Sequence, residues 1–378
     1  MTEARHIILA SGGTGGHIFP ARALGEELLA RGYVVTLMTD MRGEKYEELF
    51  PGVRVLRVAS GSPSIRGLLG KVKAAGALLG GFVQSRRLLR RLKPSAVVSF
   101  GGYPSMPPAA AAANLGIPLL LHEQNAVLGR VNRLLANRAR FIATSFENTE
   151  SGDGKRIAKM IHTGNPVRRA ILALAGKGYS APRDEGPLNL LILGGSQGAT
   201  ILSDVVPGAL AALPESLRAR LQVTQQCRPE DLERVAGLYR ESAIAATLAS
   251  FFDNVPELLA NCHLAITRSG ASTLAELGVA GRPALLVPFK HAMDDHQRKN
   301  AEEAVSAGAA RLVLQDDFTV EEASRQIADL LSHPDHLAAM AAAMASLGET
   351  HAAKKLADLL ECTIAADTEI KKTGKAAA

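Results

Sequence analysis

The sequence has 378 residues, of which 47% are hydrophobic and only 4% aromatic, and its formal net charge is +6. A chain of this length exceeds what one hydrophobic core usually supports, so we expect two domains. Its three cysteines, Cys227, Cys262 and Cys362, are too few and too scattered for a disulfide framework or a zinc pattern.

Short aliphatic runs alternate with helical patterns along both halves, which predicts doubly wound parallel sheets covered by helices. The uncharged stretch Pro94–Leu121 is broken by glycines and prolines, so we interpret it as buried strands and a short helix rather than a membrane span. The predicted strands are His6–Ser11, Tyr33–Thr39, Val53–Ala59, Ala96–Phe100, Pro118–His122, Phe141–Thr144 and Met160–His162, then Leu188–Leu193, Leu221–Gln225, Ala245–Ala249, His263–Thr267, Ala284–Pro288 and Ala310–Leu314.

Each half opens with a strand, a glycine turn and a helix, at "ILASGGTGGH" and at "LLILGGSQGA". We therefore predict domains at residues 1–164 and 165–345. A C-terminal helix at about 346–363 should pack back on the first domain, and the polar end, residues 364–378, should be disordered.

Neither glycine loop fits a standard dinucleotide or triphosphate motif. The dinucleotide fingerprint would need glycine at Ile18, and a Walker loop would need Lys-Ser/Thr after its second glycine. Asp40 ends the second strand, where a ribose-binding acid would lie, although such residues are common helix caps. A nicotinamide enzyme is therefore only a weak alternative.

A basic segment, Ser64–Lys93, interleaves apolar and cationic residues at roughly helical spacing. It lies within Leu49–His122, which holds ten basic residues and no acidic one. Residues 1–164 carry a net charge of +11, and the remainder carries −5. Nucleic acid is a competing partner, but the chain has no tryptophan and no recognised nucleic-acid module. We expect no nucleic acid but an anionic membrane surface, at the residues Ile65, Leu68, Leu69, Val72, Leu79, Phe82, Arg86, Arg87, Arg90 and Arg91.

In the second half, "TRSGASTLAEL" predicts a strand, a turn at Arg268–Gly270 and a helix whose N-terminal N–H groups suit a diphosphate. Glu276 lies one turn further along, where a carboxylate can accept both hydroxyls of a ribose. A plain helix-surface glutamate would look the same. The following "HAMDDHQRKNA" offers polar groups suited to sugar hydroxyls.

Together these segments resemble the MurG family, the bacterial UDP-N-acetylglucosamine:lipid-linked muramyl-pentapeptide N-acetylglucosaminyltransferases. The resemblance is collinear from Ile7 to about Leu360. It rests on "GGTGGHIFPA", "FGGYPS", "HEQNAVLGRVNRLLA", "TGNPVR", "GGSQGA" and "RSGASTLAELGVAGRPALLVPF…DDHQRKNA". It implies a GT-B fold, an α/β architecture of two Rossmann-like domains facing across a cleft, and inverting transfer that needs no cofactor and no metal.

The resemblance also implies roles for individual residues. Glu276 would bind the ribose, Arg168 and Ser196 the UDP moiety, and Phe252 the uracil. The donor set is Thr14, Gly15, Asn125, Arg168, Ser196, Phe252, Ser269, Gly270, Ala271, Ser272, Thr273, Glu276, His296 and Gln297. The acceptor diphosphate would lie on Gly13, Gly15, Gly16, Gly101, Gly102, Tyr103 and Ser105.

The histidine that follows the first glycine loop is the candidate general base. Histidine side chains titrate near pH 6.5, so His17 suits removal of a hydroxyl proton at neutral pH. Glu123 in "HEQN" is the rival base, unless it only orients a neighbour. A histidine that merely holds the turn is the alternative for His17.

The resemblance implies a peripheral enzyme on the cytoplasmic face of the inner membrane, in peptidoglycan synthesis. Its partners would be UDP-N-acetylglucosamine and the undecaprenyl-diphosphate muramyl-pentapeptide. The alternatives are a transferase acting on another lipid, such as diacylglycerol, and a nucleotide-sugar epimerase. The latter would need no basic amphipathic surface.

Overall fold

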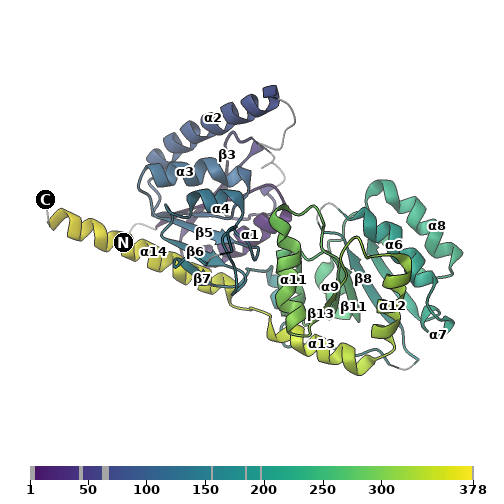
Figure 1. Ribbon diagram of the computed structural model, residues 1–378. Helices are drawn as coiled ribbons and strands as arrows, with labels where there is room; N and C mark the ends of the chain where they lie inside the picture. Colours follow the sequence, from purple (N-terminus) through teal and green to yellow (C-terminus); the bar gives the residue numbers. More distant parts are fainter. Residues whose placement is uncertain are drawn as a thin grey trace. The chain divides into compact units, whose positions relative to one another are not determined.

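The computed structural model describes residues 5–41, 46–61, 68–154, 156–183, 185–195 and 198–376. The chain divides into two compact units (Figure 1). Unit 1 comprises Met1–Arg168 and His351–Ala378, and unit 2 comprises Arg169–Thr350.

Unit 1 is built on a parallel sheet with the strand order β3-β2-β1-β4-β5-β6-β7. The order reverses direction between the neighbours β1 and β4, whose register pairs Ile8 with Val97. The strands are β1 (His6–Ala10), β2 (Val34–Thr39), β3 (Arg54–Arg57), β4 (Ala96–Ser99), β5 (Leu119–Glu123), β6 (Phe141–Thr144) and β7 (Met160–His162). The helices are α1 (Gly15–Ala30), α2 (Leu68–Leu92), α3 (Met106–Asn114), α4 (Arg130–Leu135) and α14 (Ala352–Ala376), with a 3₁₀ turn, η2 (Tyr103–Ser105).

Alternation along the strands divides the core of unit 1 between the two faces of its sheet. In β1, Ile7 and Leu9 belong to the cluster that includes residues of α1 and α14, whereas Ile8 and Ala10 belong to the cluster that includes residues of α2, α3 and α4. Successive side chains of a strand point to opposite faces, so an uninterrupted apolar run is what a sheet covered on both sides requires.

The C-terminal helix α14 returns to unit 1, where it packs beside α1 (Figure 1). Its buried Leu356 and Leu360 join the same cluster as Ile7. The structure describes α14 as helical through Ala376. The disorder that the sequence predicts for residues 364–378 stays a prediction.

Unit 2 contains a second parallel sheet, with the order β10-β9-β8-β11-β12-β13. Its direction reverses between β8 and β11, as that of unit 1 does between β1 and β4. The strands are β8 (Leu188–Leu193), β9 (Leu221–Gln226), β10 (Ala245–Ala249), β11 (Leu264–Thr267), β12 (Ala284–Leu286) and β13 (Ala310–Leu312). The helices are α5 (Arg169–Leu172), α6 (Thr200–Ala211), α7 (Glu215–Arg218), α8 (Leu232–Glu241), α9 (Val255–Asn261), α10 (Ala271–Ala280), α11 (His296–Ser306), α12 (Val320–Leu331) and α13 (Pro334–Ser346).

The thirteen strands predicted from the sequence are the thirteen that the described residues form, with ends that differ by at most two residues. The predicted fold class, two doubly wound parallel sheets covered by helices, is confirmed. In such sheets, ligands bind beyond the carboxyl ends of the strands at the point where the strand order reverses. By this rule, ligands are expected at the loops after β1, β4 and β5 in unit 1, and at the loops after β8, β11 and β12 in unit 2.

Candidate functional site

The loops after β1 and β4 approach each other closely in unit 1. A Cβ atom added to Gly12 would lie 2.7 Å from Thr39 Oγ1 and 2.8 Å from Pro104 Cβ, so only glycine fits there. Gly101 and Gly102, after β4, both have positive φ angles, of 77° and 73°. The two glycine motifs therefore form one tightly packed edge of the sheet.

His17 stands at the centre of this edge, in the first turn of α1. Its Nδ1 lies 2.9 Å from Oε1 of Gln124, the residue that follows β5. On its other side, a Cβ atom added to Gly102 would lie only 3.3 Å from His17 Nε2. The motifs "GGTGGH", "FGGYPS" and "HEQN" thus converge on a single imidazole.

Behind His17, a buried pair of side chains continues inward. The Gln124 Nε2 atom lies 2.9 Å from His122 Nδ1, and His122 Nε2 lies 3.4 Å from the Gly164 carbonyl oxygen. His122 is fully buried, and its pKa is lowered to about 4, mainly because burial disfavours the charged form. It is therefore neutral at physiological pH. Neither Gln124 nor His122 was a candidate from the sequence, although polar side chains at the end of a strand are a usable signal.

The rival base, Glu123, is committed to backbone and amide donors. Its Oε1 accepts hydrogen bonds from the backbone N–H and the Nδ2 of Asn125, at 3.1 and 3.2 Å. Its Oε2 accepts from the Gly129 N–H and from Asn132 Nδ2, both at 2.8 Å. The side chain is 2% exposed. Its geometry is that of a group that organises the loop after β5, and it holds Asn125 in place.

The predicted acceptor residues differ in how they are used. Gly13, Gly15 and Gly16 are partly exposed at the N-terminus of α1, where the first N–H groups of a helix lack intrahelical partners. Thr14, which belongs to the predicted donor set, is exposed beside them. Ser105, in contrast, is buried and donates its hydroxyl hydrogen to the Gly102 carbonyl at 2.9 Å. Ser105 therefore shapes the turn. The buried Tyr103 hydroxyl has no hydrogen-bond partner in the described part of the chain.

In unit 2, Arg268 and Ser269 anchor the turn between β11 and α10. The Arg268 guanidinium is buried and donates to the carbonyls of Val287 and Pro288, both at 3.0 Å, and burial lowers its pKa to about 10. Ser269 Oγ donates to the Gln297 carbonyl at 2.7 Å. The loops after β11 and β12 are thereby joined.

The sugar-binding candidates that follow β12 also have defined geometry. Gln297 Oε1 accepts the Phe289 N–H at 2.9 Å. The donor atom of the same amide group, Nε2, is therefore directed away from Phe289. His296 Nδ1 lies 2.8 Å from the Met293 carbonyl, which makes Nδ1 the donor. Asn300 Nδ2 donates to the Ser269 carbonyl at 3.1 Å, a contact that sequence inspection missed.

The helix α10 begins at Ala271 after the N-cap residue Gly270. Thr273 and Glu276 are partly exposed. The Ser272 hydroxyl is buried, with no hydrogen-bond partner among the residues that the structure describes. The predicted residues Ser269–Glu276 therefore lie together, in the turn after β11 and at the start of α10, at the carboxyl edge of the sheet.

The loop after β8 is tied to its neighbours by Gln226, at the end of β9. Its Oε1 accepts the Gly194 N–H at 3.2 Å, and its Nε2 donates to the Ser250 carbonyl at 3.2 Å. Phe252, two residues further along, is half-buried. The predicted Ser196 lies outside the described residues. Arg168 belongs to unit 1, with its guanidinium 4.9 Å from the ring centre of Phe19.

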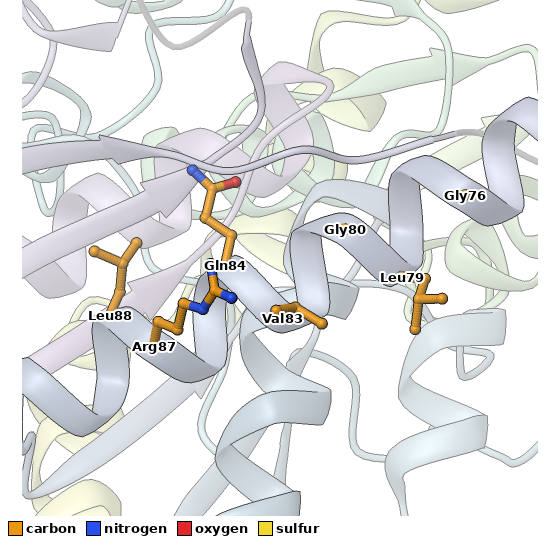
Figure 2. A pocket seen from close by; sticks show the side chains of 7 residues that line it. All are labelled: Gly76, Leu79, Gly80, Val83, Gln84, Arg87 and Leu88. Atoms are coloured by element: carbon orange, nitrogen blue, oxygen red, sulfur yellow. The ribbon is translucent and has the colours of Figure 1, made fainter.

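Helix α2 of unit 1 carries the predicted membrane face. Val72, Leu79 and Val83 are 62%, 67% and 40% exposed, and Leu79 and Val83 line a shallow hollow together with Arg87 (Figure 2). Arg90 and Arg91 are exposed further along the helix.

Other predicted members of this face differ. Phe82 is half-buried, with its ring packed against the cluster formed by α2, α3 and the sheet. Arg86 is partly buried and donates its Nε hydrogen to Asn114 Oδ1 at 2.9 Å. Ile65 and the side chains of Leu68 and Leu69 lie outside the described residues.

In the part of the chain that the structure describes, no helix combines the length and the apolar character of a membrane span. No cluster of three or more His, Cys, Asp or Glu side chains in the same residues could hold a metal ion.

Comparison with known proteins places the chain among transferases. The glycosyltransferase family 28 N-terminal domain matches residues 7–144, and the family 28 C-terminal domain matches residues 189–360. The chain is 50% identical over 359 residues to the UDP-N-acetylglucosamine--N-acetylmuramyl-(pentapeptide) pyrophosphoryl-undecaprenol N-acetylglucosamine transferase of Paramagnetospirillum magneticum, covering 95% of this chain and 97% of that protein.

A second relative carries the same name. The protein from Rhodospirillum centenum is 51% identical over 352 residues, covering 93% of each chain. Among solved structures, the crystal structure of Acinetobacter baumannii MurG has a TM-score of 0.76 and 29% identity, and the match covers 94% of this chain and 99% of that one.

Proposed function

The chain belongs to glycosyltransferase family 28, and we propose that it transfers N-acetylglucosamine from UDP-N-acetylglucosamine to a lipid-linked N-acetylmuramyl-pentapeptide. It is an N-acetylglucosaminyltransferase of peptidoglycan synthesis, and the transfer inverts the anomeric centre. An epimerase sharing the fold is set aside, because relatives about half identical over nearly the whole chain are named as transferases.

The observation that best supports the chemistry is the convergence of three loops on His17. Its Nδ1 is engaged by Gln124, while Nε2 has no hydrogen-bond partner among the described residues and faces Gly102. The competing carboxylate, Glu123, has both oxygens occupied by four donors. We therefore assign the general base to His17.

The reaction is a single displacement. His17 Nε2 takes the proton of the muramyl 4-hydroxyl as that oxygen bonds to the anomeric carbon of the donor sugar. The bond from this carbon to the diphosphate oxygen breaks, and its electron pair leaves with UDP. The imidazolium then returns its proton to solvent. Backbone N–H groups at a helix N-terminus are suited to the charge on the departing diphosphate.

The donor is assigned to unit 2. The start of α10, at Ser269–Thr273, would take the diphosphate, and Glu276 the ribose hydroxyls, one turn further along. Gln297 and His296 would contact the sugar, and Phe252 the base. Arg168 and Ser196 complete the proposed UDP contacts, and Thr14, Gly15 and Asn125 the proposed sugar contacts from unit 1.

The acceptor is assigned to unit 1. Its diphosphate would lie on the N-terminus of α1 and the glycines after β4. The acceptor's long lipid tail requires a membrane, and α2 offers Val72, Leu79 and Val83 beside Arg87, Arg90 and Arg91. An exposed apolar stripe flanked by cations suits the surface of an anionic bilayer. We place the enzyme on the cytoplasmic face of the inner membrane for that reason.

A panel of donors and acceptors tests this function. Purified protein should release UDP when UDP-N-acetylglucosamine is combined with a muramyl-pentapeptide diphosphate lipid, but not with diacylglycerol. The product should carry one added N-acetylglucosamine by mass. Release with diacylglycerol alone, or conversion of the donor to an epimer, would assign the site to another reaction.

A further inference from the structure

The hydrogen bonds behind His17 determine which of its two nitrogens carries the proton. A neutral imidazole has one N–H donor and one acceptor nitrogen, and the partner of one nitrogen fixes the state of the other. The chain of contacts runs from His17 through Gln124 to His122 and ends at the Gly164 carbonyl. The inner end of this chain has a defined direction, because a carbonyl oxygen can only accept a hydrogen bond.

Two carbonyl oxygens orient the inner groups. His122 Nε2 lies 3.4 Å from the Gly164 oxygen, so Nε2 must carry the proton that is donated there. In a neutral ring, Nδ1 is then an acceptor, and the Gln124 atom 2.9 Å from it must be the amide nitrogen. The same Gln124 atom lies 3.4 Å from the carbonyl oxygen of His122. This second acceptor independently supports its assignment as the amide nitrogen.

The orientation of the amide sets the state of His17. With its nitrogen turned toward His122, Gln124 presents Oε1 to His17, and an amide oxygen can only accept. His17 Nδ1 must therefore carry the proton, and the lone pair is left on Nε2. Nε2 is the nitrogen that faces Gly102, where the acceptor is proposed to bind.

We propose that Gln124 is a positioning residue that holds His17 in the tautomer protonated at Nδ1, and that His122 fixes the orientation of the Gln124 amide. The role of this tautomer in transfer rests on the proposed function, in which His17 Nε2 removes the hydroxyl proton. The buried state of both inner side chains supports the assignment, since Gln124 and His122 are 2% and 0% exposed. The low pKa of His122 keeps that ring neutral, as the chain requires.

Among the residues that the structure describes, few charged groups lie on the elements that pack against His17. His122 is the titratable group inward of it. Glu123, next to Gln124, directs both carboxylate oxygens to Asn125, Gly129 and Asn132. The Arg168 guanidinium lies over Phe19, two residues from His17. A carboxylate introduced at position 124 would therefore be a new anion in direct contact with His17.

The tautomer is measured directly by ¹⁵N nuclear magnetic resonance of the full-length protein labelled at histidine, at alkaline pH. The His17→Gln variant identifies the His17 signals. In the unsubstituted protein, we expect the proton on Nδ1 and an unprotonated Nε2. In Gln124→Met, of similar size but without an acceptor, we expect the tautomer protonated at Nε2, which an isolated histidine side chain favours in water. A proton on Nε2 in the unsubstituted protein overturns the proposal, as does an unchanged tautomer in Gln124→Met.

Kinetics provide the second readout. Gln124→Met should lower kcat at least tenfold with an unchanged KM for UDP-N-acetylglucosamine, while Gln326→Met on α12 should change neither. Gln124→Glu should recover part of kcat, because a carboxylate can accept the Nδ1 proton, and its anion should move the acidic limb of the pH profile to higher pH. Equal losses in the Met and Glu variants, with no pH shift, would mean that Gln124 is only structural.

The two proposals fail separately. If His17→Ala keeps its kcat, His17 is not the base and the catalytic assignment falls, yet the tautomer measurement still decides what Gln124 does. If His17→Ala is inactive and Gln124→Met retains the Nδ1 tautomer, the base assignment stands and the positioning role falls.

Discussion

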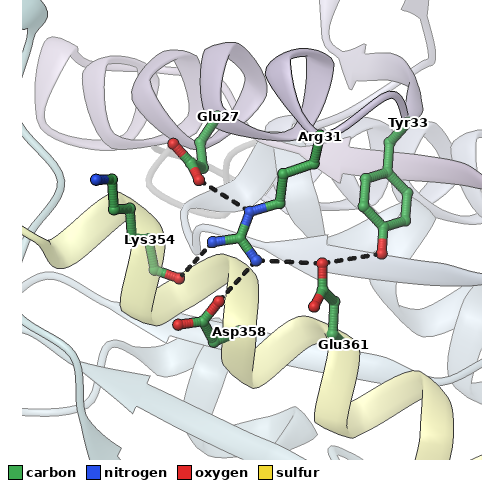
Figure 3. Close-up of polar contacts among 6 residues, drawn as sticks. All are labelled: Glu27, Arg31, Tyr33, Lys354, Asp358 and Glu361. Carbon is green, nitrogen blue, oxygen red and sulfur yellow. Dashed lines mark hydrogen bonds and ion pairs between the residues drawn. The ribbon is translucent and has the colours of Figure 1, made fainter.

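Arg31, the C-cap residue of α1, and Asp358 of α14 form an ion pair at 2.6 Å, although 327 positions separate them in the sequence. The same guanidinium contacts Glu27, Glu361 and the Lys354 carbonyl, and Glu361 also accepts the Tyr33 hydroxyl (Figure 3). Burial acts to lower the pKa of Arg31, but the contacts with Asp358, Glu27 and Glu361 outweigh it and raise the pKa above its ordinary value. Through its ion pairs with Asp358 and Glu361, Arg31 thus links α14 to the C-terminal end of α1.

Replacing Arg31 should therefore loosen α14. Arg31→Met keeps the aliphatic stem and removes the charge, and it should lower the free energy of unfolding by about 1 kcal/mol, since partly exposed ion pairs are worth little individually. Arg22→Met, which removes only the pair with Glu26 on α1, should cost less. Chemical denaturation measures both, and hydrogen exchange in residues 352–364 should rise only in Arg31→Met. Equal stability of the two variants would contradict the role of Arg31.

The assignment of Glu276 predicts a specific loss of donor affinity. Glu276→Ala removes a charged acceptor of two ribose hydroxyls, and hydrogen bonds to charged groups contribute about 1.5–3 kcal/mol each. Calorimetric binding of UDP-N-acetylglucosamine should weaken at least tenfold. Glu302→Ala, an exposed glutamate of α11, is the matched control and should bind normally. Unchanged affinity in Glu276→Ala would remove this residue from the site.

The membrane assignment predicts a result that depends on which arginines are reversed. Arg90→Glu/Arg91→Glu should weaken binding to vesicles containing anionic lipid about thirtyfold or more, because each basic residue contributes about 1 kcal/mol at such a surface. Arg138→Glu/Arg140→Glu, exposed elsewhere on unit 1, changes the net charge equally and should have a smaller effect. Similar losses in both variants, measured by sedimentation with vesicles, would indicate attraction to overall charge rather than a binding face on α2.

The face of α2 shows where prediction from sequence ends. The strands could be located because buried parallel strands are continuous apolar runs bounded by glycine, proline and polar residues. On α2, however, apolar residues occur on both sides of the helix, and Phe82 packs inward while Leu79 is exposed. Which side is covered depends on distant contacts, such as the approach of Gly81 to the Ala59 carbonyl.

The site shows the same limit. Its loops could be predicted, because motifs at the ends of strands β1, β4 and β5 must meet at one edge of a parallel sheet. The contact that orients the catalytic candidate could not be, since it depends on the Gly164 carbonyl, 42 positions after His122. Hydrogen bonds at such separations follow from the assembled fold, and the pattern "HEQN" alone does not distinguish the roles of its members.

The buried His122 predicts a pH dependence of stability. Its pKa is about 4 in the folded protein, against about 6.5 when unfolded, so the unfolded chain binds the proton first as the pH falls. The stability that His122 contributes is therefore complete above about pH 6.5 and is lost between pH 6.5 and 4, by about 3 kcal/mol at most. His122→Gln should show a shallower loss over this range in denaturant titrations, and His162→Gln, an exposed histidine of β7, should match the unsubstituted protein.

The final prediction distinguishes the two candidate bases. His17→Ala should lower kcat by about 10²–10⁴-fold, the usual cost of removing a general base, and should leave donor binding intact because the donor is assigned to unit 2. The acidic limb of its pH profile should flatten, since the proposed general base is gone. Glu123→Gln exchanges an acceptor for a donor against the Gly129 N–H or Asn132, so it should lower stability and reduce kcat less than His17→Ala. A nearly inactive but stably folded Glu123→Gln, together with an active His17→Ala, would transfer the base role to Glu123.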